Sequence, residues 1–464
     1  MEVLQRTANR GSISDGGYEI GNSCKFEPDN SEAFNTTNQA AGNRKTWTFS
    51  AWVKRSELGS LQTIFGAGDV FIRFDTPDVI QTYAGGYVTT NRKFRDTSAW
   101  YHIVWLLDTT QSTASNRSRL YVNGVQETSF SGAAYPDQNA DLDLGGQGAS
   151  SNWIQVGRWY AGGRLFSGYM AEVHYVNGTV AEPTAFGEFD EDSGIWKPKK
   201  YTGGGYGTQG FYYKFDDSSS MGKDSSGEGH NANSVENITA ADQSTDTPTN
   251  NFATLNPLFY QATKFSSITN GNTTFTSDSG TTFNTLVSTI GMSSGKYYFE
   301  VKRIAERGLV GITDVTRAKL NTNSTYYPGD TDNSVDWGYY SDDGKVYNNG
   351  NPTGSGATWG NGDIVGCAVD LDNRKIYWHK NGSYINSGNP STGANGQTIS
   401  SDVTYYFAVA GYTSTTFNQN FGNGFFGTTA VTSSNADAAG HGLFEYAVPT
   451  GYFSLNTKNL NTYG

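Results

Sequence analysis

The residues Trp100-Tyr101-His102-Ile103-Val104-Trp105-Leu106-Leu107 form a run that is apolar at almost every position. Such a run fits a central strand of a β-sandwich, because both faces of that strand are buried. After Asp108 and a polar loop comes Leu120-Tyr121-Val122-Asn123-Gly124, which ends in an Asn-Gly dipeptide. This dipeptide is the strongest short-range hairpin signal, since a type I′ turn needs positive φ at both central residues. Residues 100–124 therefore predict a strand, a loop and a hairpin arm of an all-β fold.

The second half of the chain contains the same order of elements. Ile364-Val365-Gly366-Cys367-Ala368-Val369 is an apolar strand, and Asp370 follows it directly. After a short loop, Ile376-Tyr377-Trp378-His379-Lys380-Asn381-Gly382 again ends in Asn-Gly. The same strand, loop and hairpin order in both halves predicts two copies of one architecture.

Composition agrees with an all-β chain of many short strands. The 464 residues include 57 Gly, 29 Tyr, 26 Phe and 10 Trp. Aromatic residues favour strands and glycines favour tight turns. We expect two tandem sandwiches joined by a Gly/Ser/Asp-rich linker. The predicted parts are an N-terminal arm (1–20), a first sandwich (21–186), a linker with one packed strand (187–258), a second sandwich (259–430) and a C-terminal tail (431–464).

Charge and targeting signals restrict the partners. The net charge is −12 and the pI is about 4.9, so phosphate backbones and anionic membranes are repelled. No stretch approaches 18 apolar residues, so we expect no membrane insertion. Met1-Glu2-Val3-Leu4-Gln5-Arg6 lacks the apolar core of a secretory signal. Cys24 and Cys367 form no CxxC pair and are predicted to lie in different domains.

Each half of the chain resembles a known family. The first half resembles LamG-like, concanavalin A-like lectins in the stretches 48–53, 100–104, 120–124 and 166–173. The second half resembles SPRY domains in the stretches 295–301, 309–312, 362–370 and 376–382. The resemblance implies a concanavalin A-like jelly-roll sandwich for both halves. It also implies binding of glycans or proteins, in some LamG members through calcium.

The pairing of the two domains is more specific than either half. A LamG-like domain followed by SPRY, joined through residues 246–257, resembles virion proteins of tailed phages, many of them marine. That resemblance implies a virion location at the surface or tail, other virion proteins as partners, and a homo-oligomer, with a trimer favoured. The function expected is a fibre or tail-associated adhesin for a host surface glycan or protein. The alternative is a capsid-decorating or structural fibre protein that makes only protein contacts.

Catalysis is not expected, and a glycan depolymerase is the third hypothesis. Concanavalin A-like glycosidases place carboxylates at alternate positions, because two of them must flank a glycosidic bond. Glu188, Asp190 and Asp192 do alternate, but they lie among Gly, Ser, Trp and Pro in the predicted linker. We therefore interpret these residues as solvated acidic groups.

Binding candidates are aromatic residues, whose ring faces can stack on sugars. For each of them, burial in a sandwich core is the competing interpretation. Calcium needs about six to eight oxygen ligands, and no other cofactor is expected. The calcium candidates are Asp141 with Asp143 and Asp330 with Asp332. The aromatic candidates and their basic neighbour are Trp153, Trp159, Tyr160 and Arg164 in the first sandwich, and Tyr326, Tyr327, Trp337, Tyr339 and Tyr340 in the second.

Overall fold

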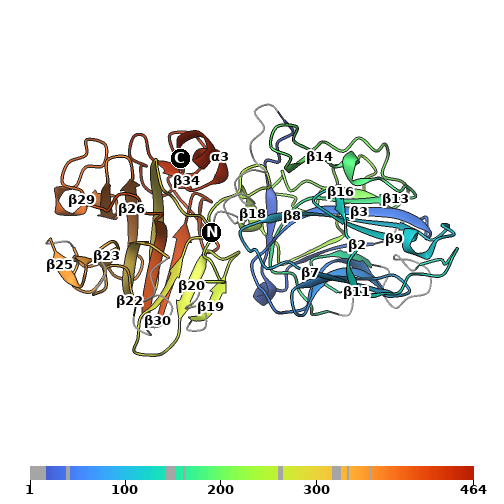
Figure 1. Cartoon of the computed structure of the whole chain (residues 1–464), viewed down its shortest axis with the longest axis horizontal. Coiled ribbons are helices and arrows are strands. Elements are labelled where there is room, and N and C mark those ends of the chain that lie inside the picture. Colours follow the sequence, from blue (N-terminus) through green and yellow to red (C-terminus); the bar gives the residue numbers. More distant parts are fainter. Residues whose placement is uncertain are drawn as a thin grey trace. The chain divides into compact units, whose positions relative to one another are not determined.

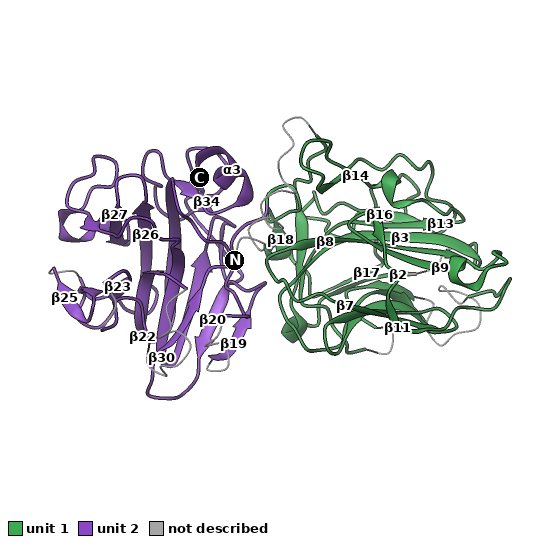
Figure 2. Cartoon of the chain, in the orientation of Figure 1, with its two compact units in different colours: residues 1–250 green, residues 251–464 purple. Residues whose placement is uncertain are grey.

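The computed structural model describes residues 17–37, 42–142, 153–159, 162–259, 265–315, 326–331, 334–354 and 357–464. The chain divides into two compact units, residues 1–250 and residues 251–464 (Figure 2). The regular structure of both is almost all β-strand, with only short helical segments (Figure 1). The predicted all-β class with two tandem jelly-roll sandwiches is thereby confirmed. No helix in the described part of the chain has both the length and the apolar character needed to cross a membrane.

The first unit is built from two eight-stranded sheets. One sheet has the order β10 (Val125–Gln126), β9 (Ser118–Val122), β8 (Trp100–Asp108), β3 (Thr46–Arg55), β13 (Gly168–Asn177), β1 (Ser23–Phe26) and β18 (Gln243–Ser244), with β16 (Phe211–Tyr213) also paired to β13. The other has the order β11 (Phe130–Ala133), β7 (Tyr87–Lys93), β6 (Val79–Tyr83), β5 (Val70–Asp75), β4 (Gln62–Ala67), β12 (Trp153–Val156), β2 (Ala33–Thr37) and β17 (Ser234–Glu236).

The core of the first unit lies between these sheets. Phe49 on β3 stacks on Phe65 on β4, with ring centroids 4.4 Å apart. Trp47 and Trp105 meet edge to face at 4.7 Å, and both are fully buried. Alternate residues of β3 point to the same side, so the period-two pattern between residues 46 and 53 supplies this inner face.

The second unit is organised around two long strands, β22 (Lys296–Thr313) and β30 (Tyr406–Asn420). Bulges interrupt their pairing between Arg303 and Arg307, and bulges bend a strand. The first half of β22 pairs with β26 (Ile364–Asp370) and its second half with β23 (Trp337–Tyr340). The other strands of this sheet are β19 (Phe265–Thr269), β20 (Thr274–Ser277), β21 (Asn284–Val287), β24 (Val346–Asn348), β25 (Asn351–Thr353), β27 (Lys375–Lys380), β28 (Ser383–Tyr384), β29 (Gln397–Thr398) and β35 (Phe453–Ser454).

Both Asn-Gly hairpins are confirmed. Asn123 and Gly124 have φ of 51° and 76°, and they join β9 to β10. Asn381 and Gly382 have φ of 48° and 81°, and they join β27 to β28. Positive φ at both central residues is the signature of the type I′ turn. In each unit the strand before the hairpin pairs antiparallel with the apolar run identified in the sequence, β8 with β9 and β26 with β27.

The segment predicted as a linker belongs to the first unit. Residues 187–250 contribute β16, β17 and β18 to its two sheets, and β14 (Gly187–Phe189) pairs with β15 (Trp196–Pro198). Trp196 is buried and donates from Nε1 to Nδ1 of His102 at 2.9 Å. The linker prediction is corrected for a physical reason. The segment has the composition of a loop, but its few aromatic residues pack on the sheets and fix it there.

The predicted C-terminal tail is likewise part of a folded unit. It contributes β33 (Asn435–Ala436), β34 (Leu443–Phe444), β35 and helix α3 (Thr457–Tyr463) to the second unit. Phe444 and Tyr452 are fully buried. β35 adds to β22 in parallel, next to Tyr297 and Tyr298. The remaining short strands are β31 (Phe425–Phe426) and β32 (Thr429–Ala430), and the 3-10 turns are Pro28–Asn30, Ala114–Asn116, Pro183–Ala185, Ala240–Asp242 and Ile385–Ser387.

Candidate functional site

The first-unit candidates lie around the end of β12. Trp153 begins that strand, is half-buried and pairs with Thr37. Arg164 lies over the ring of Trp159, with the guanidinium carbon 3.8 Å from the ring centroid. Tyr160 lies outside the described residues. The structure thus brings Trp159 and Arg164 together and leaves Trp153 at the start of the strand.

Three of the five second-unit candidates are core residues, which corrects the prediction for them. Tyr326 and Tyr339 are fully buried, and Trp337 is 8% exposed. The Tyr326 hydroxyl is bonded to the hydroxyl of Thr313 at 2.6 Å and to the carboxylate of Asp336. Trp337 and Tyr339 are buried because side chains alternate along a strand, so both lie on the inner face of β23.

Tyr327 and Tyr340, the other two candidates, are half-exposed and lie in one aromatic cluster. Phe283 joins them, with centroid distances of 4.8 Å to Tyr327 and 6.1 Å to Tyr340. Tyr412 lies 5.2 Å from Phe283, and Tyr347 lies 6.0 Å from Tyr340. We call these five half-exposed rings the aromatic patch. They come from the β20–β21 loop, the segment before β23, the end of β23, β24 and β30.

Charged groups hold the rings of the aromatic patch in place. The guanidinium carbon of Arg307 lies 4.3 Å from the Tyr412 ring centroid, and its Nη1 is 3.1 Å from Oδ2 of Asp342. Tyr340 donates its hydroxyl hydrogen to the same Asp342 oxygen at 3.2 Å. Burial and the Asp342 carboxylate raise the pKa of Tyr340 to about 12. The hydroxyl therefore stays protonated and can act as a donor.

Sequence reasoning missed Phe283, Tyr347 and Tyr412 as members of the patch. Phe283 has a weak signal, because it is a single large apolar residue in the polar stretch 278–284. Tyr412 follows the apolar run 405–410. The sequence there does not distinguish a buried strand residue from an exposed one. Neither signal indicates that the two side chains meet.

The calcium candidates form no ligand set in the described part of the chain. Asp141 is exposed, and its carboxylate is 3.8 Å from the Lys45 ammonium. Asp330 is buried and accepts from the backbone N–H of Thr331 at 2.6 Å. Asp143 and Asp332 lie outside the described residues. Among the described residues, no group of three or more His, Cys, Asp or Glu side chains could hold a metal ion.

The alternating carboxylates lie on the β14–β15 hairpin. The Glu188 carboxylate is 3.7 Å from the ammonium groups of both Lys197 and Lys199. Hydrogen bonds from the backbone and hydroxyl of Ser193 lower the pKa of Asp190 to about 2. A general acid for glycoside hydrolysis needs a raised pKa, so Asp190 does not fit that role. Asp192 is exposed at the turn.

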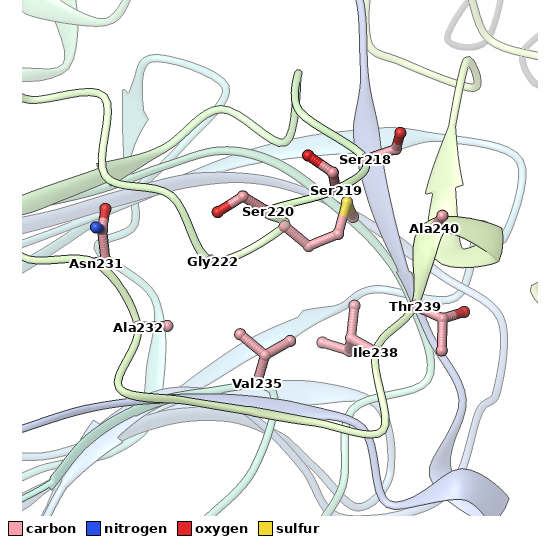
Figure 3. Close-up of a pocket in the computed structure, with 11 residues that line it drawn as sticks. Ser218, Ser219, Ser220, Gly222, Asn231, Ala232, Val235, Ile238, Thr239 and Ala240 are labelled. Atoms are coloured by element: carbon pink, nitrogen blue, oxygen red, sulfur yellow. The ribbon is translucent and has the colours of Figure 1, made fainter.

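A pocket of about 360 Å³ lies between two loops of the first unit (Figure 3). In Figure 3, Ser218, Ser219 and Ser220 lie across from Val235 and Ile238. Uncharged side chains, both polar and apolar, make the lining, which includes no charged group and no aromatic ring. The pocket therefore lacks the groups that stack on a sugar or carry out acid–base chemistry. Its other lining residues are Met221, Gly222, Asn231, Ala232, Thr239 and Ala240.

A buried carboxylate anchors the C-terminal segment of the second unit. Oε1 of Glu300 accepts from the Tyr298 hydroxyl at 2.8 Å and from the Tyr446 N–H at 2.9 Å, and Oε2 accepts from the Glu445 N–H at 2.9 Å. Tyr298 is also 2.6 Å from Nε2 of His379. Burial raises the pKa of Glu300 from 4.5 to about 7 and lowers that of His379 to about 3. The histidine is therefore neutral, and Glu300 titrates near neutral pH.

This pKa shift predicts a pH-dependent stability of the second unit. The folded-state pKa of Glu300 lies above the unfolded value, so between pH 4.5 and 7 the folded state binds the extra proton. The Glu300 contribution to the free energy of unfolding therefore falls as the pH rises through that window, by about 3 kcal/mol in total. Glu300→Gln mimics the protonated carboxyl and should remove this dependence. Denaturant unfolding of both proteins at pH 5 and pH 8 measures it, and equal pH slopes would contradict the assignment.

The fold and its surface define a protein of two concanavalin A-like β-sandwiches. The model of the concanavalin A-like lectin/glucanases superfamily matches residues 28–184, and the model of the SPRY domain matches residues 296–418. The chain therefore carries a LamG-like, concanavalin A-like domain followed by a SPRY domain. Both are binding-type folds, and the superfamily of the first also includes glucanases.

Curated relatives match only a short part of the chain. Ran-binding protein 9 of Danio rerio and of Homo sapiens are each 36% identical over 89 residues, 19% of this chain. The match spans 14% and 12% of the length of those relatives. Among solved structures, the SPRY domain of human HERC1 is 22% identical, with a TM-score of 0.25 over 32% of this chain and 87% of that chain. A human SPRY domain is 19% identical, with a TM-score of 0.24 over 32% of this chain and 90% of that one.

Proposed function

We propose that the protein is a non-catalytic adhesin of a tailed-phage virion that binds a host surface glycan or protein. Two things support this proposal. The order of the domains, LamG-like and then SPRY, resembles that of phage virion proteins. The second unit also carries the aromatic patch, which is the single observation that favours recognition over a purely structural role.

The aromatic patch has the chemistry of a binding surface. Tyrosine and arginine are enriched among the residues that contribute most to binding energy. Here, four tyrosines, Phe283 and Arg307 converge from separate segments. Ring contacts and the bonds from Arg307 and Tyr340 to Asp342 fix the side chains before a ligand arrives. Such preorganisation lowers the entropy lost on binding.

An assembled particle would present many copies of this surface. Linked copies bind by avidity, so a weak single site suffices. We propose a homo-oligomer, with a trimer favoured, at the virion surface or tail. The proposal requires no cofactor, nucleic acid or membrane insertion. In the alternative function, as a decorating or structural fibre protein, the same patch is covered by another virion protein.

We expect the double variant Tyr327→Ala, Tyr340→Ala to bind host cells at least about tenfold more weakly than the unaltered chain, because it removes two rings of the patch. The measurement is binding of the fluorescently labelled full chain to a panel of intact bacterial strains, followed by binding to a glycan array. Tyr87→Ala is the matched control, since Tyr87 is 50% exposed on β7 of the first unit.

Two results would contradict the proposal. If the double variant binds as well as the unaltered chain, the aromatic patch is not the surface that recognises the host. Binding to no strain and no glycan would favour the structural alternative, which predicts that the patch becomes protected from hydrogen exchange only in the assembled virion.

A further inference from the structure

A second concave surface lies on the first unit, outside the aromatic patch. It is a pocket of about 460 Å³, which is within the usual size range for small-ligand sites. Segments far apart in the sequence form it, namely Tyr18 before β1, residues 200–206 after β15, and residues 212–216 around β16. We call it the tyrosine pocket. Its lining residues are Tyr18, Lys200, Tyr201, Gly204, Tyr206, Tyr212, Lys214, Asp216 and Ser225.

The rings of the tyrosine pocket are held in fixed positions by residues behind them. Tyr212 stacks on His174 with centroids 4.2 Å apart, and Tyr201 stacks on Phe186 at 4.8 Å. Tyr206 and Tyr212 are parallel, with an interplanar angle of 2° and centroids 6.2 Å apart. Tyr201 and Tyr212 are nevertheless half-exposed. Each of these two rings therefore has one face packed on the protein and part of its surface open.

Hydrogen bonds anchor three of the four hydroxyls. Tyr18 and Tyr212 both donate to the buried carboxylate of Glu172, at 2.9 and 2.6 Å. The Tyr206 hydroxyl is 2.8 Å from Nδ1 of His174. Burial, reinforced by the Glu172 carboxylate, raises the pKa of Tyr18 and Tyr212. These phenols are therefore neutral at physiological pH, and the rings need no rearrangement to receive a ligand.

The two lysines at the rim of the pocket differ in whether an acidic group neutralises them. The Lys214 ammonium lies 3.0 Å from the Asp216 carboxylate, which neutralises it. Lys200 is exposed and makes no ion pair within the part of the chain that the structure describes. Lys200 therefore leaves one unpaired positive charge at the rim of this pocket, while the carboxylate of Glu172 lies behind Tyr18 and Tyr212 and that of Glu228 accepts from the backbone N–H of Tyr206 at 3.3 Å.

We propose that the tyrosine pocket is a saccharide-binding site that takes a pyranose ring bearing a carboxylate. The open surfaces of Tyr201 and Tyr212 would stack on the apolar face of the sugar, and Lys200 would pair with its carboxylate. The site is independent of the aromatic patch, so the two proposals can fail separately.

The test uses the full chain and a glycan array that carries neutral, uronic-acid and sialylated oligosaccharides. We expect the unaltered chain to bind carboxylate-bearing glycans and Tyr201→Ala to lose at least about tenfold in affinity. Lys200→Gln should bring the affinity for a bound acidic glycan down to that for its carboxyl-reduced form. Tyr201→Phe keeps the ring and should retain most of the binding.

Controls separate the loss of a site from the loss of the fold. Lys200 is exposed, so Lys200→Gln should leave the thermal unfolding midpoint unchanged even if Tyr201→Ala lowers it. Tyr87→Ala alters an exposed residue of the first unit outside the tyrosine pocket and should bind the array glycans like the unaltered chain. The proposal is overturned if no glycan on the array binds, if Tyr201→Ala binds as well as the unaltered chain, or if Lys200→Gln keeps the preference for acidic glycans.

Discussion

Replacing Asp246 with alanine will destabilise the first unit by about 3–5 kcal/mol, because it breaks a buried ion pair. The Asp246 carboxylate lies 2.6 Å from the Lys54 ammonium, and the two side chains are 2% and 1% exposed. Its other oxygen accepts from Nε1 of Trp100 at 3.1 Å. The variant leaves the Lys54 charge in a buried site without this carboxylate, and that is more costly than the loss of one hydrogen bond.

The measurement is the free energy of unfolding from denaturant titration, with hydrogen exchange to locate the change. Exchange should increase in peptides of β3 and β8 and stay the same in β22 of the second unit, which serves as an internal reference. Asp141→Ala is the matched control, because its pair with Lys45 is 3.8 Å long and largely exposed and should contribute about 1 kcal/mol at most. Equal effects of the two variants would show that residue 246 is a surface position of a linker.

The second large effect is expected from Phe444→Ala, which should destabilise the second unit by about 3–5 kcal/mol. Phe444 is fully buried and meets the Tyr298 ring edge to face, with centroids 4.9 Å apart. It packs in one cluster with Ala368, Tyr377 and Tyr452. Alanine would leave a cavity between the C-terminal segment and the sheet, and the adjoining backbone is already tied to Glu300.

The neighbouring residue supplies the control for Phe444. Leu443 is 39% exposed on the same short strand, so Leu443→Ala should change the free energy of unfolding by about 0.5 kcal/mol. Denaturant titration of both variants gives the comparison, and hydrogen exchange in β22 and β26 shows whether the loss lies in the second unit. Similar, small effects of the two substitutions would mean that residues 431–464 form a detachable tail.

Much of the fold could be predicted from short stretches of sequence. The Asn-Gly dipeptides set the hairpins because their φ requirement is local, and the run 100–107 identified a buried strand because both of its faces are apolar. The extent of each unit could not be predicted in this way. Residues 187–250 have the composition of a loop, and only contacts such as that between Trp196 and His102 place them in the first unit.

The candidate site was predicted only in part. Tyr327 and Tyr340 lie in the aromatic patch, whereas Tyr326, Trp337 and Tyr339 lie in the core. Adjacent aromatic residues point to opposite faces of a strand, and the sequence does not say which face is covered. The tyrosine pocket was not predicted, because Tyr201 and Tyr206 lie in a Gly-rich stretch that resembles flexible chain.

The sequence by itself determined the class of the protein, its two tandem sandwiches and their hairpins, since these depend on periodicity and turn chemistry over a few residues. Only the tertiary structure decided where the chain could bind a ligand. Both candidate surfaces are made by rings that converge from separate segments, Phe283 with Tyr412 in one unit and Tyr18 with Tyr212 in the other. Such meetings arise from the packing of whole sheets, and no local pattern encodes them.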